Sequence, residues 1–456
     1  MKEIKYYPMT TSQDLLLFAD KFIFKKAWMN IAAVLSIDGE VDEQIMLQAM
    51  YLALVRTPSA SLRLHKADKK TIVQYFSTAL PEGLELLDYS SLSDEDFLAL
   101  MEKKARKAFP HKGIETQLYD LKLISRGNNR YAIYINAHHM AFDAFAVMSL
   151  IRYIADVYAV LLHGGELPRP MGSPIPMYEA EAAYAKSDAF RKELDFWKAY
   201  YDPNDEPMYT NLYGKGSKFH NKGKRTGIAV LPFKNKALHE NLVIPAKTVS
   251  AVTELVAKWR ITSQSFYVAA LHTYLSMIND TNDVLTFNAV ARRATLVQKR
   301  GGGSMVNTVA VRTKVDRAAT SFRDACTAAH RSISQSYRSA NVLFKDTSSI
   351  YLKNYNMGQT DGYAGVYVCY QPYFNMDNSS MKFHFQRLNN GGTTSCLYLT
   401  IMACDNSGDL VVNYEHAAAY YDAATICKFH DFLVKFLAAA VASPDETIES
   451  LAKKCL

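Results

Sequence analysis

The sequence is interrupted once in its middle third by a dense run of helix- and strand-breaking residues, from Gly164-Gly165 to Pro174. Such a run indicates a boundary, because neither glycine nor proline continues a helix or strand without cost. The chain has 456 residues, whereas a single hydrophobic core stops growing at roughly 250–300 residues. We therefore expect two lobes, the first over residues 1–172 and the second over residues 173–456.

On both sides of this break, apolar residues recur with helical spacing and with strand spacing in alternation. In the first lobe these patterns predict helices over residues 11–22, 41–55, 93–108 and 142–162, and strands over 29–37, 72–76 and 131–137. In the second lobe they predict helices over 178–201, 247–259, 262–278 and 422–441, and strands over 284–290, 305–313, 365–371, 396–404 and 409–415. Helices that alternate with strands indicate an α/β fold in each lobe.

Composition excludes several classes of protein. A net charge of +7 is small for this length and does not predict nucleic-acid binding. No stretch approaches the roughly 18 apolar residues that span a bilayer, and Met1 to Gln13 lacks the apolar run of a signal peptide. The six cysteines lie in the last third without a CxxC pair, which favours reduced thiols over disulfides or a zinc site. We expect a cytoplasmic protein with no metal, no nucleic-acid partner and no membrane span.

The most informative string is HHMAFDA, His138 to Ala144, which directly follows the apolar strand pattern YAIYINA. A side chain at a strand-to-helix junction can stand clear of the sheet and reach a cleft. Histidine suits proton transfer there because its unperturbed pKa is about 6.5. A neutral imidazole can take a proton from an amine or alcohol that attacks a carbonyl. Asp143 follows His139 by four residues, which puts both on one side of a helical turn.

Other chemical signatures are missing from the sequence. Gly301-Gly302-Gly303 lacks the spacing of a phosphate-binding loop, and no HExxH or GxSxG string occurs. The cysteines are far from the histidine pair in sequence, so direct attack on a carbonyl is favoured over an acyl-enzyme intermediate. A histidine pair at a strand end is also compatible with a structural role, so this string alone leaves the function open.

The string HHMAFDA resembles the H-H-x-x-x-D-G signature of the condensation domains of nonribosomal peptide synthetases, which are relatives of the chloramphenicol acetyltransferase-like acyltransferases. Further segments resemble that family in the same order along the chain. They are the opening Tyr7–Gln13 (YPMTTSQ), the strand, turn and helix of residues 29–64, Tyr178, the Phe196-Trp197 pair, the string Gly303–Arg312 (GSMVNTVAVR) and the closing strand and helix of residues 410–448. The resemblance covers essentially the whole chain, and this order is more specific than any single motif.

This resemblance implies an α/β fold of two chloramphenicol acetyltransferase-like lobes, arranged as a V-shaped pseudo-dimer with a central tunnel. His139 matches the catalytic histidine of the family, and His138 matches its structural neighbour. Asp143 matches a residue that orients the motif through a salt bridge to an arginine. Arg292 aligns best with that arginine, and Arg293 lies one step away.

The resemblance also assigns the segments around the tunnel. The tunnel floor is expected at about residues 290–308, which include Asn307. A latch that crosses from the second lobe to the first is expected at about residues 371–395. Ala144 replaces the final glycine of the signature. Its extra methyl narrows the space beside the tunnel, and this change need not abolish activity.

By the same resemblance, the chain is expected to be an acyltransferase of secondary metabolism that forms an amide between a donor acyl thioester and the amine of an aminoacyl-carrier protein. Both substrates are expected on phosphopantetheine, or the donor as acyl-CoA, with no permanently bound cofactor. The expected partners are a donor and an acceptor carrier protein and a downstream adenylation domain, with the chain itself monomeric. Met1 lies just before the first motif, which fits an initiating, N-acylating domain. Whether His139 acts as a general base or positions the amine stays open.

Two alternatives stay open. One is a free-standing, CoA-dependent N- or O-acyltransferase. The other is a non-catalytic module that recruits a carrier protein, which Ala144 and the degraded family segments at residues 56–64 and 339–345 motivate. The basic clusters at Lys103–Lys107 and Lys215–Arg225 are either solvated surfaces or a surface for an acidic carrier protein or coenzyme A phosphates. The sequence does not identify the acyl group or the amino acid.

Overall fold

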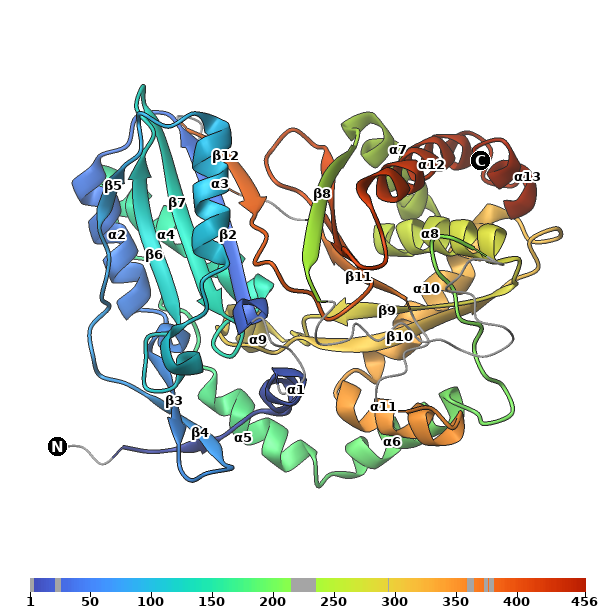
Figure 1. The fold of residues 1–456 in the computed structure, drawn as a ribbon, viewed down its shortest axis with the longest axis horizontal. Helices are drawn as coiled ribbons and strands as arrows, with labels where there is room; N and C mark the ends of the chain where they lie inside the picture. The colour runs from blue at the N-terminus through green and yellow to red at the C-terminus, as the bar shows by residue number, and fades with distance from the viewer. Residues whose placement is uncertain are drawn as a thin grey trace.

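The computed structural model describes residues 4–20, 26–214, 235–293, 295–358, 365–372, 376 and 381–456. Figure 1 shows two lobes side by side, each a β-sheet with helices packed on it. We call the lobe that begins at the N-terminus the N-lobe and the lobe that carries the C-terminus the C-lobe. The basic cluster at Lys215–Arg225 lies outside the described residues.

The N-lobe sheet follows the order β12-β2-β7-β6-β5 in the part of the chain that the structure describes. These strands are β2 (Asn30–Asp38), β5 (Leu86–Asp88), β6 (Tyr119–Ser125), β7 (Arg130–His138) and β12 (Lys382–Arg387). Neighbouring strands are antiparallel except for β5 and β6. Helices α2 (Glu43–Val55) and α4 (Ala144–His163) share the apolar core on one face, and α3 (Asp94–Ala105) covers the other face.

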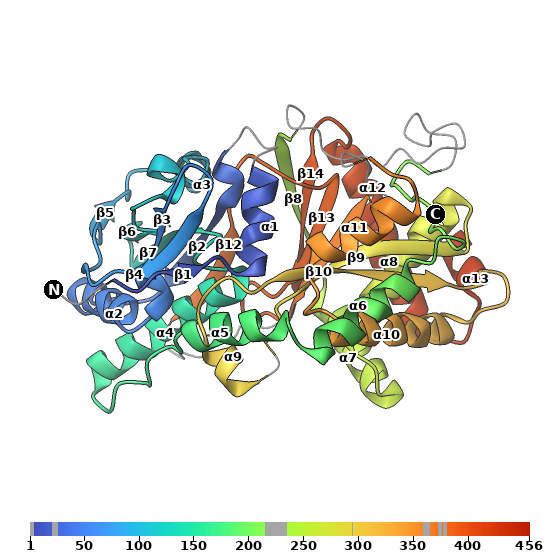
Figure 2. The ribbon, with the colours of Figure 1, turned by 90° about the horizontal axis from the view of Figure 1, so that it is seen from below.

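A smaller sheet in the order β1-β4-β3 extends the N-lobe. Its strands are β1 (Tyr7–Pro8), β3 (Leu62–Lys66) and β4 (Ile72–Phe76). Helix α1 (Thr11–Asp20) follows β1 directly. Figures 1 and 2 both show α1 where the two lobes meet, so the N-terminal segment reaches the junction that the rest of the fold creates.

The C-lobe sheet follows the order β10-β9-β11-β13-β14-β8. Its strands are β8 (Ala237–Ile244), β9 (Asp283–Val290), β10 (Asn307–Lys314), β11 (Val366–Gln371), β13 (Leu397–Met402) and β14 (Leu410–Ala417). One face packs on α7 (Ala246–Trp259), α8 (Ser263–Asn279), α10 (Phe322–Arg338), α12 (Ala423–Ala442) and α13 (Ile448–Lys453). On the other face, α6 (Asp188–Tyr200) and α11 (Phe344–Asn354) cover β9 and β10. Sheets covered by helices in both lobes confirm the predicted α/β class.

The helix predicted over residues 178–201 is wrong, because the structure has two helices there, α5 (Ile175–Tyr184) and α6. Ser187 begins the second helix, since its side chain accepts a hydrogen bond from the Phe190 N–H at 3.2 Å. An uninterrupted helix would leave that serine in the interior. The N-cap therefore outweighs the continuous helical periodicity on which the prediction rested.

Helix α4 corrects a second expectation, that no segment approaches a membrane span. By length and composition alone it is long and apolar enough to cross a membrane. In the structure its apolar side chains, including Val147, Leu150 and Ile154, lie in the N-lobe core against α2 and the sheet. A long buried helix and a membrane span share the same composition, because both face an apolar environment.

Two segments of the C-lobe half of the chain enter the N-lobe. Strand β12 pairs with β2 at the edge of the N-lobe sheet (Figure 1), within the range assigned to the latch. Helix α9 (Leu296–Arg300) leads into Gly301-Gly302-Gly303, which we call the glycine run and which packs on the N-lobe. There the Gly172 N–H donates to the Arg300 carbonyl at 2.7 Å. A Cβ on Gly302 would lie 2.2 Å from Ser59 Oγ and 3.0 Å from Ser59 Cβ, so any larger residue here would require Ser59 to move.

Candidate active site

The histidine pair stands where β7 ends. His138 is the last residue of the strand, and its N–H donates to the Leu118 carbonyl at 2.9 Å. The His139 N–H donates to the Met29 carbonyl at 2.8 Å, and the N–H groups of Ala141 and Phe142 both donate to the His138 carbonyl. Main-chain hydrogen bonds from the neighbouring strand segments therefore hold both histidines before the chain turns into α4.

His138 is buried, with 5% of its surface exposed. Its Nδ1 accepts a hydrogen bond from the Met140 N–H at 3.3 Å, and its ring meets Phe109 edge-on at 5.4 Å. Burial and the neighbouring His139 lower the pKa of His138 to about 4. An uncharged ring whose Nδ1 is already engaged suits a structural role.

His139 is partly exposed and stands beside a residue of the C-lobe. Its Nδ1 lies 3.4 Å from Ser304 Oγ. Burial lowers the pKa of His139, the charge of Asp143 and a contact with its own main chain oppose that shift, and Arg387 lowers the pKa further. In an uncharged imidazole, one of the two ring nitrogens is free to accept a proton.

Asp143 caps α4 and joins the two lobes. Its Oδ1 accepts from the Ala146 N–H at 2.9 Å, and its Oδ2 accepts from Arg293 Nη1 at 2.7 Å and from the Met305 N–H at 2.9 Å. Arg293 Nη2 also donates to the Gly303 carbonyl at 2.8 Å. Both side chains of the ion pair are almost completely buried. The ion pair thus holds Gly303 and Met305 against the turn that carries the histidines.

The structure corrects the choice of arginine, since Arg293 and not Arg292 pairs with Asp143. Arg292 Nη1 instead donates to Ser12 Oγ at 3.3 Å and to Glu181 Oε1 at 3.2 Å. Arg292 has a φ of 52°, in the left-handed region that non-glycine residues rarely adopt. This conformation ends the side-chain alternation of β9 and turns the next residue, Arg293, toward Asp143.

Ala144 and Asn307 occupy less reactive positions. Ala144 is the first residue of α4 and is partly exposed, and a helical backbone at this point accepts its methyl group without strain. Asn307 is buried, its Nδ2 donates to the carbonyls of Ala340 and Val342, and its Oδ1 accepts from the Phe344 N–H. The amide of Asn307 therefore fixes the start of β10 to the segment before α11.

Sequence reasoning missed a buried amide pair beside the histidines. Gln13 Nε2 donates to the Met140 carbonyl at 2.7 Å and to Gln74 Oε1 at 2.8 Å, while Gln74 Nε2 donates back to Gln13 Oε1 at 2.9 Å. Both glutamines are fully buried. Gln13 is the last residue of the opening string YPMTTSQ, which resembles the family. Only the tertiary structure reveals that the Gln13 side chain holds the turn after His139.

Comparisons with known proteins agree with the geometry. A family model described as "Condensation domain" matches residues 3–453. Surfactin synthase subunit 1 of Bacillus subtilis (strain 168) is 22% identical over 461 residues, which cover 98% of this chain and 12% of that protein. Enterobactin synthase component F of Escherichia coli (strain K12) is 23% identical over 197 residues, which cover 42% of this chain and 15% of that protein. The chain thus matches only a small part of the length of these relatives.

Solved structures share the fold. The first condensation domain of the calcium-dependent antibiotic synthetase, in complex with a substrate analogue, superposes with a TM-score of 0.82 at 19% identity and covers 98% of both chains. A variant of the starter condensation domain of rhizomide synthetase, in complex with C8-CoA, gives a TM-score of 0.81 at 16% identity over 98% of this chain and 97% of that chain.

The Asp143 pairing predicts different costs for two adjacent arginines. Arg293→Ala leaves a buried carboxylate without its cation and should lower the free energy of unfolding by about 3–5 kcal/mol. Arg292→Ala removes a less enclosed pair and should cost about 1–2 kcal/mol. Urea unfolding followed by circular dichroism measures both, and a larger loss for Arg292→Ala than for Arg293→Ala would contradict the pairing.

Proposed function

The chain belongs to the condensation-domain family, and from this premise we propose that it joins an acyl thioester to an acceptor amine with the His139 imidazole at the reaction centre. Domains of this family are amide-forming acyltransferases of nonribosomal peptide synthesis, and their fold is a pseudo-dimer of two chloramphenicol acetyltransferase-like lobes. The observation that carries the proposal is the place of His139. It is a partly exposed, uncharged imidazole at the lobe junction, beside Ser304 of the opposite lobe.

The reaction that this geometry supports is a direct acyl transfer. The acceptor amine attacks the thioester carbonyl, the C–N bond forms, the C–S bond breaks, and the donor thiolate leaves. The His139 imidazole accepts the proton that the amine loses and passes it to the thiolate, so charge and atoms balance. Positioning the amine by a hydrogen bond is the second role open to the same ring. In both cases, holding two tethered reactants together supplies much of the rate.

Condensation domains use carrier-bound or CoA-linked substrates without a permanent cofactor. For this chain we propose phosphopantetheine-tethered substrates, delivered by a donor and an acceptor carrier protein, with an adenylation domain as a downstream partner. We further propose that the domain itself is monomeric and acts in the cytoplasm. Over the described residues, no group of three or more histidine, cysteine, aspartate or glutamate side chains is placed to hold a metal ion.

Likeness to a starter condensation domain solved with C8-CoA favours an initiating role, in which the chain N-acylates the first amino acid. The same likeness keeps a CoA-dependent acyltransferase as the second candidate. The two differ in the donor they accept, because a carrier protein adds a docking surface that free coenzyme A lacks.

His139→Ala should lower the rate of amide formation by about 100- to 10,000-fold, because it removes the proton acceptor. Product is measured by mass spectrometry with an acyl-carrier donor and an aminoacyl-carrier acceptor. His163→Ala is the matched control, since His163 is an exposed histidine at the other end of α4. Undiminished turnover in His139→Ala, with circular dichroism unchanged, would refute the assignment, as would tight carrier binding by wild type without any product.

Donor preference should separate the two candidate functions. We expect kcat/KM for an acyl-carrier donor to exceed kcat/KM for the same acyl group on CoA by about tenfold or more. The reason is that each 1.4 kcal/mol of binding free energy from carrier docking, if it is retained in the transition state, raises kcat/KM by a factor of about ten. Steady-state kinetics with matched acyl chains measures the ratio. A preference for acyl-CoA would make the chain a CoA-dependent acyltransferase.

The imidazole of His139 should titrate below pH 6.5, the usual pKa of histidine. Burial disfavours its charged form more strongly than Asp143 and its own main chain favour it. A lowered pKa keeps more than half of the rings uncharged at pH 6.5, the state that a base requires. An NMR titration of the histidine ring signals measures the midpoint, with His139 identified by its loss in His139→Ala. A midpoint above 6.5 would contradict this account.

A further inference from the structure

Residues 381–392, which we call the crossing segment, carry the C-lobe chain onto the N-lobe and back. The segment comprises β12, antiparallel to β2, and the turn Asn389-Asn390-Gly391-Gly392. The turn is tight because the side chains of Asn389 and Asn390 accept hydrogen bonds from the N–H groups of Gly391 and Gly392, at 2.7 and 3.0 Å. A segment of this kind can transmit the position of one lobe to the other.

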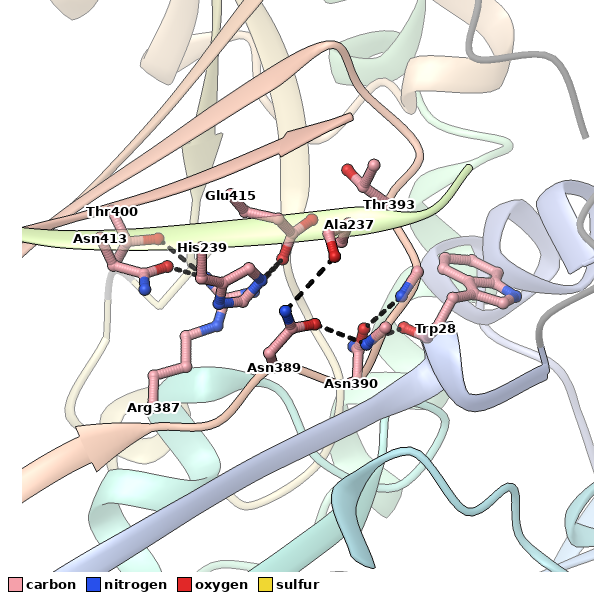
Figure 3. A network of polar contacts seen from close by, with 12 residues as sticks. Trp28, Ala237, His239, Arg387, Asn389, Asn390, Thr393, Thr400, Asn413 and Glu415 are labelled. Carbon is pink, nitrogen blue, oxygen red and sulfur yellow. Dashed lines mark hydrogen bonds and ion pairs between the residues drawn. The ribbon is translucent and has the colours of Figure 1, made fainter. Parts of the chain in front are cut away.

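On the N-lobe side, the crossing segment contacts the main chain that holds His139. Asn390 Nδ2 donates to the carbonyls of Asn30 at 2.9 Å and of Trp28 at 3.3 Å (Figure 3). The carbonyl between these two, that of Met29, accepts the His139 N–H at 2.8 Å. One buried amide thus holds the residues on both sides of the carbonyl that fixes His139.

On the C-lobe side, the same segment is held by an ion pair over the sheet (Figure 3). Arg387 Nη2 donates to Glu415 Oε2 at 2.9 Å, and Arg387 Nη1 donates to Thr400 Oγ1 at 3.1 Å. His239 Nε2 lies 3.3 Å from the same Glu415 oxygen. Asn389 Nδ2 donates to the Ala237 carbonyl at 3.3 Å. Within four residues, the chain is therefore attached to both lobes.

Glu415 is buried and charged. Burial acts to raise its pKa, but the Arg387 charge and the contact with His239 overcome that effect and lower the pKa of Glu415 to about 2. Buried ion pairs add little net stability, because desolvation offsets their attraction, whereas an unpaired buried charge is costly. The Arg387–Glu415 pair therefore adds little to the stability of the fold. Its main effect is to restrict the position of the crossing segment.

Arg387 also acts on His139 through space. The charged groups that act on the imidazole are Asp143 at the start of α4, which is paired with Arg293, and Arg387 on β12, and the uncharged ring of His138 on β7 is its neighbour along the chain. Asp143 favours the imidazolium form of His139, and Arg387 opposes it. Asn390 is uncharged and has no such effect, so the contributions of the two residues to His139 can be separated.

We propose that Arg387 and Asn390 are positioning residues for the condensation. Arg387, held by Glu415, fixes the crossing segment to the C-lobe sheet, and Asn390 passes that position through the main chain of Met29 to His139. This inference rests on the proposed function and adds to it a dependence of His139 on the contact between the lobes. It matters for rate because a 1 Å error in the placement of a reacting group can cost about 100-fold.

The test compares Arg387→Gln and Asn390→Ala with wild type in the full chain. Both variants should lose about 10- to 100-fold in kcat while KM for the donor and acceptor carriers changes by less than about threefold, because the proposed effect is on the placement of His139 and not on a contact with the carriers. In the NMR titration, Arg387→Gln should raise the midpoint of His139, and Asn390→Ala should leave it unchanged. Arg312→Gln is the matched control, because it breaks a largely buried pair with Asp283 on β9.

Arg387→Gln leaves Glu415 with His239 as its remaining charged or titratable neighbour. If that variant unfolds, the variant Arg387→Gln with Glu415→Gln, which removes both charges, replaces it in the kinetic test. The proposal is overturned if the double variant and Asn390→Ala both keep a kcat within twofold of the Arg312→Gln control. An unchanged His139 midpoint in Arg387→Gln, which removes the positive charge alone, overturns the electrostatic part. Failure of wild type to form amide with any donor refutes the proposed function instead, and the titration still reports on Arg387.

Discussion

The buried ion pair between Asp143 and Arg293 is the contact on which the rest of the site depends. The two residues are 150 positions apart in the chain, one at the start of α4 and the other beyond the end of β9. A buried carboxylate is tolerated only with its hydrogen bonds satisfied, so α4 and the glycine run must assemble together. Their assembly places Ser304 of the C-lobe beside the imidazole of His139.

The chemistry follows from the different surroundings of two adjacent histidines. Successive side chains at the end of a strand point in opposite directions. The ring of His138 is therefore enclosed against Phe109, and the ring of His139 faces the opposite lobe. Burial keeps both rings uncharged, but only His139 stands beside a junction that substrates can share. The glycine run and the crossing segment define that junction, because each leaves the C-lobe and packs on the N-lobe.

Periodicity predicted the elements that carry the site, including β7, α4 and β10, because their apolar faces have strong and regular signals. It missed α10, although Phe322, Cys326 and Ile333 recur with helical spacing on the buried face of that helix, so the signal was present in the sequence. It also missed β12 (KFHFQR), whose partner strand lies in the other lobe. Asn390 and Asn30, which meet beside β12, are 360 residues apart, and no local pattern encodes such a contact.

The sequence by itself determined the α/β class, the resemblance to a family and the place of the histidine pair at a strand end. These features are local, or follow from the order of motifs along the chain. Only the tertiary structure decided which arginine meets Asp143, because two adjacent arginines fit the family motif and the left-handed backbone at Arg292 is not recorded in the sequence. It alone also decided that Gln13 and Asn390 hold the main chain around His139. Hydrogen bonds between distant segments depend on how the lobes pack, and spacing along the chain does not record that packing.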